Sequence, residues 1–158
     1  MENASQLATR FREIVLNGRW IANTNFMDQL AQVNREQATH RIGSLNTIAA
    51  LTFHINYYIA GVLNVFEGGG LEIRDRYSFD LPPIETEEAW EALVNTLKTN
   101  AEKFADHVGR MSAETLDSGF VDEKYGTYRR NIEGMIEHSY YHLGQVSLIR
   151  KMILADGK

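Results

Sequence analysis

The feature that most constrains this chain is a long and almost uninterrupted apolar segment, residues 47–66, which is followed by three consecutive glycines at residues 68–70. Drawn as a helix, the segment is apolar around most of its circumference, which is typical of a helix buried on several sides. Because glycine sustains a helix poorly, we expect the helix to end near Glu67. Ser44 is its predicted N-cap.

A membrane-spanning helix is the alternative for a segment of this length, since about 20 apolar residues cross a bilayer. His54, Asn56 and Asn64 interrupt the apolar run, and no other segment could partner it in a membrane. These residues favour a buried helix of a soluble protein with no membrane partner. The N-terminus lacks the basic-then-apolar order of a secretion signal, so we expect a cytoplasmic protein.

The spacing of apolar residues and the positions of capping residues predict three further long helices. The predicted elements are long helices over residues 5–16, 86–109 and 127–154, a short helix within 23–41, and irregular connections over 71–84 and 111–126. Long helices without an alternating strand pattern indicate an all-α fold, a four-helix bundle in one domain over residues 1–158. The connections are longer than those of simple bundles, so we expect crossovers or segments that wall a pocket.

The composition excludes several classes of function for this chain. The chain has 16 basic and 21 acidic side chains, a formal net charge of −5. Nucleic-acid binding rests on clustered Lys and Arg, so the acidic excess argues against a dedicated nucleic-acid partner. The chain has no cysteine, which excludes disulfides, thiolate metal ligands and a cysteine nucleophile.

Three of the five histidines form a candidate metal site. His138 and His142 lie four residues apart in the last predicted helix, so both imidazoles share one face, with Cβ atoms about 6 Å apart. His54 lies in the middle of the buried helix, where each ring nitrogen needs a partner. A histidine pair on one helix that faces a single histidine on another suits a metal in a bundle core. We therefore predict that these three residues bind a metal ion.

The alternative is a structural cluster without metal, in which a hydroxyl of Tyr57 or Tyr58, or a backbone carbonyl, satisfies His54. The other two histidines have structural interpretations. His40 lies in a polar stretch and is interpreted as a surface residue, and His107 lies near a helix end, where a partly exposed imidazolium is favoured.

Three polar residues are candidates for the surroundings of the site or for a substrate pocket. Gln145 and Asn131 share the helix face of the two paired histidines, and Tyr58 lies one turn after His54. Gln145 could contact a metal-bound water or a substrate, or it could only border a buried site. Gly134, on the same helix, could leave room for a substrate or could only allow close helix packing.

The segments NTIAALTFHINYYIAGVL and MIEHSYYHLGQVSLIRK resemble the DinB-like, or YfiT-like, superfamily of metalloenzymes. The pattern there is a single histidine on the second helix and an HxxxH motif, often continued by Gly-Gln, on the fourth. The corresponding residues here are His54, His138, His142 and Gly144-Gln145. The resemblance spans nearly the whole chain and is closest to an uncharacterised branch of the superfamily.

This resemblance implies a four-helix bundle with a crossover, a divalent ion (commonly zinc or nickel) held by the three histidines, and a homodimer. Characterised relatives use the metal with a low-molecular-weight thiol, as S-transferases or as a thiol-dependent isomerase. Other members, including the DNA-damage-inducible one that names the group, have no known reaction.

Two functions of different classes follow. The first is a metal-dependent enzyme that activates a small-molecule thiol or a water for transfer or hydrolysis; without cysteines in the chain, any thiol must arrive as a cosubstrate. The second is a non-catalytic metal- or ligand-binding stress-response protein, which is favoured because no carboxylate shares the helix face of His138 and His142. A third interpretation is that the three histidines pack together and bind nothing.

Overall fold

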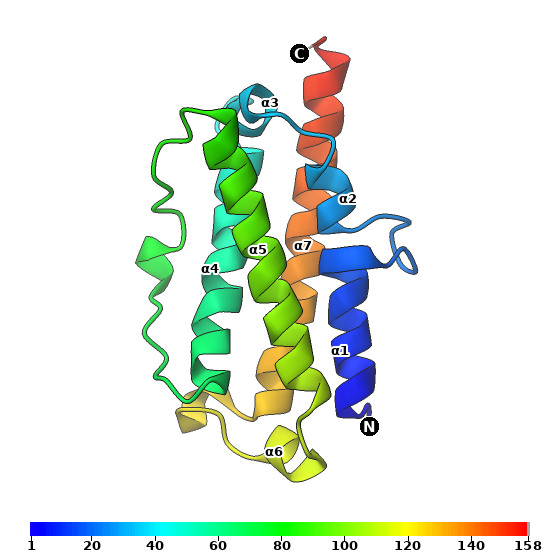
Figure 1. Cartoon of the computed structure of the whole chain (residues 1–158), viewed down its shortest axis with the longest axis vertical. Coiled ribbons are helices and arrows are strands. Elements are labelled where there is room, and N and C mark those ends of the chain that lie inside the picture. The colour runs from blue at the N-terminus through cyan, green and yellow to red at the C-terminus, as the bar shows by residue number, and fades with distance from the viewer. Residues whose placement is uncertain (158) are drawn as a thin grey trace.

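The computed structural model describes residues 1–157, and over these residues the chain is all-helical, with seven α-helices and no β-strand. The helices are α1 (Ala4–Arg12), α2 (Phe26–Leu30), α3 (Arg35–Thr39), α4 (Ile48–Phe66), α5 (Glu87–Gly109), α6 (Ala113–Asp117) and α7 (Tyr128–Ala155). A π-helical turn, Glu13–Asn17, continues α1. In Figure 1, α1, α4, α5 and α7 lie side by side along the long axis of the molecule, with α3 near one end and α6 at the other.

The three longest helices begin where a threonine caps the first turn. The hydroxyls of Thr47, Thr86 and Thr127 accept hydrogen bonds from the backbone N–H three residues later, at 3.1, 3.2 and 3.2 Å. These bonds satisfy donors that a helix start leaves unpaired. The predicted N-cap of α4 is wrong: Ser44 lies in a turn, and α4 begins three residues later than expected, because the Thr47 hydroxyl is the one that accepts from a backbone N–H of the first helical turn.

α4 packs against both α5 and α7 and contributes many of the buried residues of the core. Ile55 and Ile59 have no exposed surface. By length and composition α4 could cross a membrane, but 61% of its most apolar stretch is buried inside the fold. This is the packing expected for the core helix of a soluble protein.

The connection between α4 and α5, residues 67–86, returns along α4 to the start of α5, and we call it the strap (Figure 1). The Tyr57 hydroxyl fastens it, since it donates to the carbonyl of Arg74 (3.1 Å) and accepts from the backbone N–H of Arg74 (2.9 Å). Ile73 occupies the space where a Cβ of Gly61 would stand, at 2.4 Å from that position. The strap is irregular, as predicted, apart from one 3-10 turn at Asp75–Tyr77.

The connection between α5 and α7 also runs beside the ends of α4 and α7. The sequence predicts no helix in it, and that prediction is wrong, since α6 forms there. The Ser112 hydroxyl caps α6 by accepting from the backbone N–H of Thr115 at 3.0 Å. A helix of five residues that buries only Leu116 is too short to show an apolar period in the sequence.

Candidate metal centre

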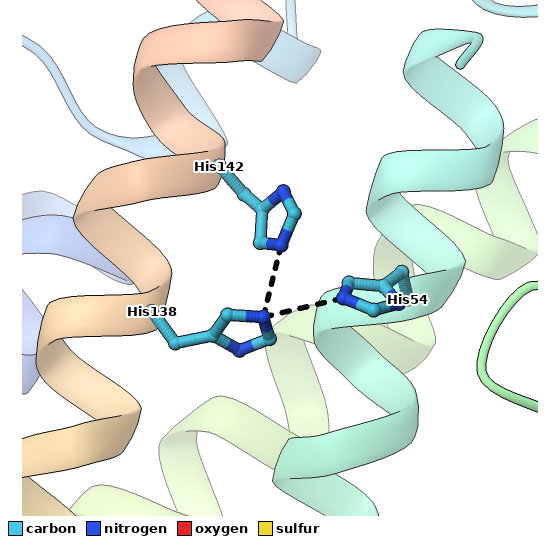
Figure 2. Close-up of side chains that lie close together, drawn as sticks. All are labelled: His54, His138 and His142. Carbon is cyan, nitrogen blue, oxygen red and sulfur yellow. Dashed lines mark hydrogen bonds between the residues drawn. The ribbon is translucent and has the colours of Figure 1, made fainter. Parts of the chain in front are cut away.

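The three histidines predicted as metal ligands meet between α4 and α7 (Figure 2). The Nε2 atom of His138 lies 3.2 Å from Nε2 of His54 and 2.9 Å from Nε2 of His142. His54 and His142 are 7% and 6% exposed. One ligand atom from each ring lies within 4.8 Å of the others. The three residues are therefore close enough to bind one metal ion.

Two of the rings are oriented by hydrogen bonds on the side that faces away from the cluster. The Nδ1–H of His54 donates to the backbone carbonyl of Ser78 (3.3 Å), and the Nδ1–H of His142 donates to Oε1 of Gln145 (2.6 Å). A neutral imidazole carries one proton, so each of these rings presents an unprotonated Nε2 to the cluster. Outer partners of this kind are typical of histidines that ligate metals.

The cluster has too few protons to be satisfied by hydrogen bonds alone. Nε2 of His138 carries at most one proton but faces two unprotonated nitrogens, so one of the two contacts has no proton to share. A divalent cation accepts all three lone pairs. Zinc–nitrogen distances of about 2.0–2.1 Å in a tetrahedral site place ligand nitrogens about 3.3 Å apart, close to the observed 3.2 and 2.9 Å. The donor set thus fits a metal ion, and imidazole ligands suit zinc, nickel, copper and iron alike.

Burial keeps the imidazoles neutral. Desolvation, together with repulsion from His142, lowers the pKa of His54 from 6.5 to about 4. Desolvation and repulsion from both other rings lower the pKa of His138 to about 4 as well. Desolvation also lowers the pKa of His142, against the opposing effect of its hydrogen bond to Gln145. Only the neutral ring binds a metal, so the fold holds these ligands in the binding form.

Aromatic side chains enclose the cluster. The Phe79 ring, from the strap, stacks on His54 with ring centroids 4.1 Å apart. The Tyr58 ring lies edge-on to His54 and His138, with centroid distances of 5.0 and 5.2 Å. The Tyr58 hydroxyl donates to Oδ1 of Asp75 (2.7 Å), and burial and this bond raise the pKa of Tyr58. The strap thus contributes a ring and a carboxylate to the site.

A cavity of about 700 Å³, which we call the site cavity, lies beside the cluster and has His138 in its wall. Its walls come from α4, the strap, the segment before α7, and α7 itself. Two of the three long connections line it, as predicted from their length, and the first connection, between α1 and α4, does not. Tyr58 and Gly134 also line it, and no atom lies within 4 Å of the position that a Cβ of Gly134 would take.

The structure places the other two predicted residues at different points. Gln145 contacts His142, as described above, and is not part of the cavity wall. Asn131 lines the cavity, and its amide donates to the backbone carbonyls of Tyr125 and Thr127 at 2.9 and 2.8 Å. Asn131 therefore holds in place the segment that forms one cavity wall.

The sequence does not predict three strap residues at the site, Asp75, Ser78 and Phe79. They lie in a stretch without apolar periodicity, and the only available signal is the length of the connection. His107, which sequence reasoning sets aside, is outside the cluster, with Nε2 3.9 Å from the Glu67 carboxylate.

Comparisons with known proteins identify no relative: no protein-family model, no curated protein and no solved structure matches the chain.

Proposed function

We propose that this chain is a metal-dependent enzyme in which His54, His138 and His142 hold a divalent ion, zinc or nickel, and that the site activates a small-molecule thiol or a water for transfer or hydrolysis. The observation that carries this proposal is the convergence of three Nε2 atoms with too few protons among them. Three protein nitrogens leave a coordination position for water or substrate, as in catalytic rather than structural zinc sites.

The neighbouring residues support chemistry at this point. A bound divalent ion would lower the pKa of a coordinated water or stabilise a coordinated thiolate. Asp75, hydrogen-bonded to Tyr58, lies in the wall of the same cavity as His138 and offers a carboxylate for proton transfer. α7 offers no carboxylate on its ligand face, so the strap supplies the group whose absence favoured a non-catalytic function.

A non-catalytic metal- or ligand-binding stress-response protein is the second candidate. One observation favours it: of the three histidines, only His138 lines the site cavity, and His54 and His142 are buried. An ion enclosed in this way would be retained with or without turnover.

The first test is elemental analysis of protein purified without an affinity tag, followed by titration with Zn²⁺ and Ni²⁺. We expect one transition-metal ion per chain and its loss in the His138→Ala variant, whereas His107→Ala, a histidine variant outside the cluster, keeps it. A wild-type chain that neither carries nor binds stoichiometric metal overturns the enzyme and the metal-binding form of the second candidate, and it favours a packing role for the histidines.

The second test separates the two candidates. Metal-loaded and chelated protein are assayed with several low-molecular-weight thiols and electrophiles, and with hydrolysable esters. Faster turnover in the loaded protein, lost in His138→Ala, supports the enzyme. Identical rates in both preparations, with stoichiometric metal present, support the non-catalytic binding protein instead.

We also propose that the fold is a four-helix bundle of the DinB-like type, formed by α1, α4, α5 and α7. Support comes from the order of the elements, since His54 lies on the second of these helices and His138 and His142 lie on the fourth. An experimental structure in which these four helices superpose on a DinB-like bundle is the expected result, and a different helix order contradicts the assignment.

We further propose a cytoplasmic homodimer without a nucleic-acid or membrane partner. Tyr141, Leu148 and Met152 form an exposed apolar stripe on α7, with Tyr141 65% and Leu148 58% exposed. Light scattering is expected to give twice the chain mass, and a monomeric mass at micromolar concentration contradicts this proposal.

A further inference from the structure

The site cavity is lined by an apolar surface next to the metal ligands. Its apolar lining is contributed by all the surrounding segments: Val62 from α4, Leu71 and Ile73 from the strap, Phe120 from the segment before α7, and Met135 from α7. A volume of about 700 Å³ lies within the range of pockets that hold drug-sized molecules, about 300–1,000 Å³. A single water or a small inorganic ion would leave most of this space unfilled.

The charged side chains of the cavity wall cancel one another. Two are acidic, Asp75 and Glu123, and two are basic, Lys124 and Arg130. Three of the four also have partners in the chain. Asp75 accepts from Tyr58, Lys124 lies 3.7 Å from a carboxylate oxygen of Asp122, and Arg130 lies 3.3 Å from a carboxylate oxygen of Glu137. The four formal charges therefore sum to zero, and each of the two cations already has a carboxylate partner, so the wall offers no unpaired cation to an anionic ligand.

Gly134 determines how much room the cavity has beside the ligands. It lies one helical turn before His138 on α7 and lines the cavity. Nothing stands within 4 Å of the position of a Cβ at this residue. Glycine within a helix costs about 0.5–1 kcal/mol relative to alanine, and no close helix contact at this position requires it. Packing therefore does not explain this glycine, whereas the open space beside His138 does.

We propose that the site cavity binds an uncharged molecule with an apolar, ring-sized body, and that Gly134 is the residue that admits it beside His138. If the chain is the enzyme proposed above, this molecule is the substrate that reacts with the activated thiol or water. The proposal that the cavity binds such a molecule does not depend on that function, because the apolar walls and the balanced charges are present without a metal.

The test uses two fluorescent probes with the same ring system. N-phenyl-1-naphthylamine is neutral, and 8-anilinonaphthalene-1-sulfonate adds one negative charge. Both are titrated into metal-free and metal-loaded protein. In the metal-free protein the neutral probe is expected to bind with the lower Kd, by about five-fold or more, because the sulfonate loses water without gaining an unpaired cation. Equal or tighter binding of the sulfonate to metal-free protein overturns the assignment of an uncharged ligand.

The matched variants are Gly134→Leu and Gly144→Leu. Both glycines are on α7 and both have open space at Cβ, but only Gly134 lines the cavity. We expect Gly134→Leu to weaken the neutral probe by about ten-fold or more by filling the cavity, and Gly144→Leu to leave its Kd unchanged. Leucine is a better helix former than glycine, and circular dichroism checks that both variants fold. A Kd in Gly134→Leu equal to that of the wild type overturns the proposal.

Leu71→Gln provides a second variant on the opposite wall, should Gly134→Leu fail to fold. It makes that wall polar without filling the cavity, so the neutral probe is expected to bind several-fold more weakly; unchanged binding counts against the proposal. The absorption of bound Co²⁺ reports the metal site separately. If the chain binds no Co²⁺ and probe binding still depends on Gly134, the proposed enzyme is wrong and the proposed ligand site is supported. If Co²⁺ binds normally and probe binding does not depend on Gly134, the metal site is supported and the proposed ligand site is wrong.

Discussion

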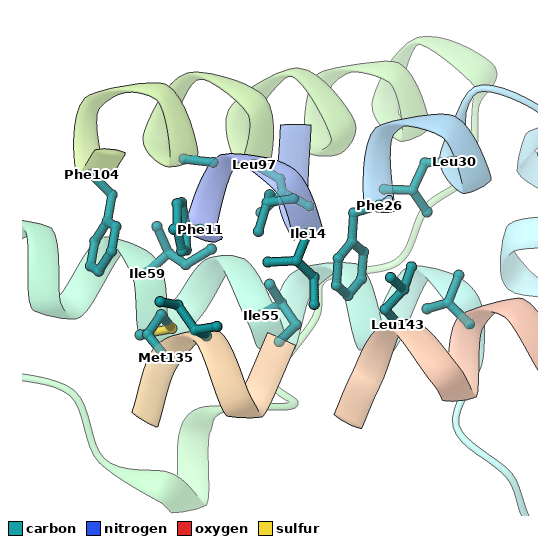
Figure 3. Packing of buried hydrophobic residues seen from close by; sticks show 14 of the residues in the cluster. Phe11, Ile14, Phe26, Leu30, Ile55, Ile59, Leu97, Phe104, Met135 and Leu143 are labelled. Carbon is teal, nitrogen blue, oxygen red and sulfur yellow. The ribbon is translucent and has the colours of Figure 1, made fainter. Parts of the chain in front are cut away.

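α4 carries two pairs of residues with the same four-residue spacing, one position out of step, and their surroundings are opposite in character. Ile55 and Ile59 are fully buried in the apolar core, which they share with Phe104 of α5 (Figure 3). His54 and Tyr58 lie one position earlier on the helix and meet the histidines of α7 and the polar atoms of the strap.

On α4, the residues that stabilise the core and the residues that form the site are only one position apart. Adjacent residues of an α-helix are rotated by about 100° about the helix axis. Burying an isoleucine side chain contributes about 1.5–3 kcal/mol, whereas a buried imidazole costs free energy unless both ring nitrogens have partners. The partners of His54 come from outside α4, Ser78 from the strap and His138 from α7. The face of α4 that carries Ile55 and Ile59, the core face, therefore depends on apolar residues alone. The face that carries His54 and Tyr58, the site face, depends on elements far away in the sequence.

The largest effect is expected from the core face. Ile59→Ala removes a fully buried side chain and should lower the free energy of unfolding by about 2–5 kcal/mol, because a cavity remains in its place. Urea denaturation of the metal-free protein measures this loss. At temperatures where the variant stays folded, its Zn²⁺ affinity should match the wild type. A parallel loss of affinity would show that the two faces of α4 are not independent.

On the site face, His54→Ala should weaken Zn²⁺ binding by more than about 100-fold. Loss of an outer partner already costs about 10–100-fold, and this variant removes a ligand. Competition with a chromogenic chelator gives the affinity. His107→Ala is the matched control, since His107 is a histidine on α5 outside the cluster. If both variants bind Zn²⁺ equally well, His54 is a packing residue like its isoleucine neighbours.

Gln145→Ala tests whether the outer partners matter as much as the rings. It removes the oxygen that accepts the Nδ1–H of His142 and should weaken Zn²⁺ binding by about 10–100-fold. Gln145→Glu keeps an acceptor oxygen at the same position and is expected to restore the affinity. Equal loss in both variants would point to bulk or packing at this position, not to the hydrogen bond.

The two faces should also differ in their response to pH. The pKa of His54 and of His138 is about 4 in the metal-free fold, chiefly through desolvation, against about 6.5 in an unfolded chain. Below pH 6.5 the unfolded chain therefore binds more protons, so stability is complete above that pH and falls as the pH drops toward 4. The fall is on the order of 1 kcal/mol per histidine between pH 7 and 5.5.

Urea denaturation of metal-free protein at several pH values tests this. His54→Ala should lose part of the pH dependence, and Ile59→Ala should keep all of it although it is less stable. A wild-type stability that is flat between pH 7 and 5 contradicts burial of neutral imidazoles at the site.

Local signals in the sequence were enough for the four long helices and for the three histidines, but not for the short helix α6. Thr86 and Thr127 are followed by apolar residues at helical spacing, and α5 and α7 begin there. The four-residue spacing of His138 and His142 places them on one face of α7 by geometry alone. Their approach to His54 was predicted from its position in an apolar helix, because a buried imidazole needs a partner from another element.

What was not predicted depends on the strap. Its residues have no period, so nothing local indicates that Ser78 would accept from His54, that Phe79 would stack on it, or that Asp75 would bond to Tyr58. These contacts are set by where the strap lies on α4, which is fixed by long-range contacts such as Ile73 beside Gly61. The charge balance and volume of the cavity depend on the same placement.

The smallest predicted effect concerns the start of α4, which carries both faces. Thr47→Ala removes the hydroxyl that accepts from Ala50 and should lower the free energy of unfolding by about 1 kcal/mol. Zn²⁺ affinity should not change, since His54 lies two turns further on. Ser44→Ala, at the exposed residue that sequence reasoning favours as the cap, should change stability by less than about 0.5 kcal/mol. Urea denaturation ranks the two, and the reverse order would place the start of α4 at Leu45, with both faces about one turn longer.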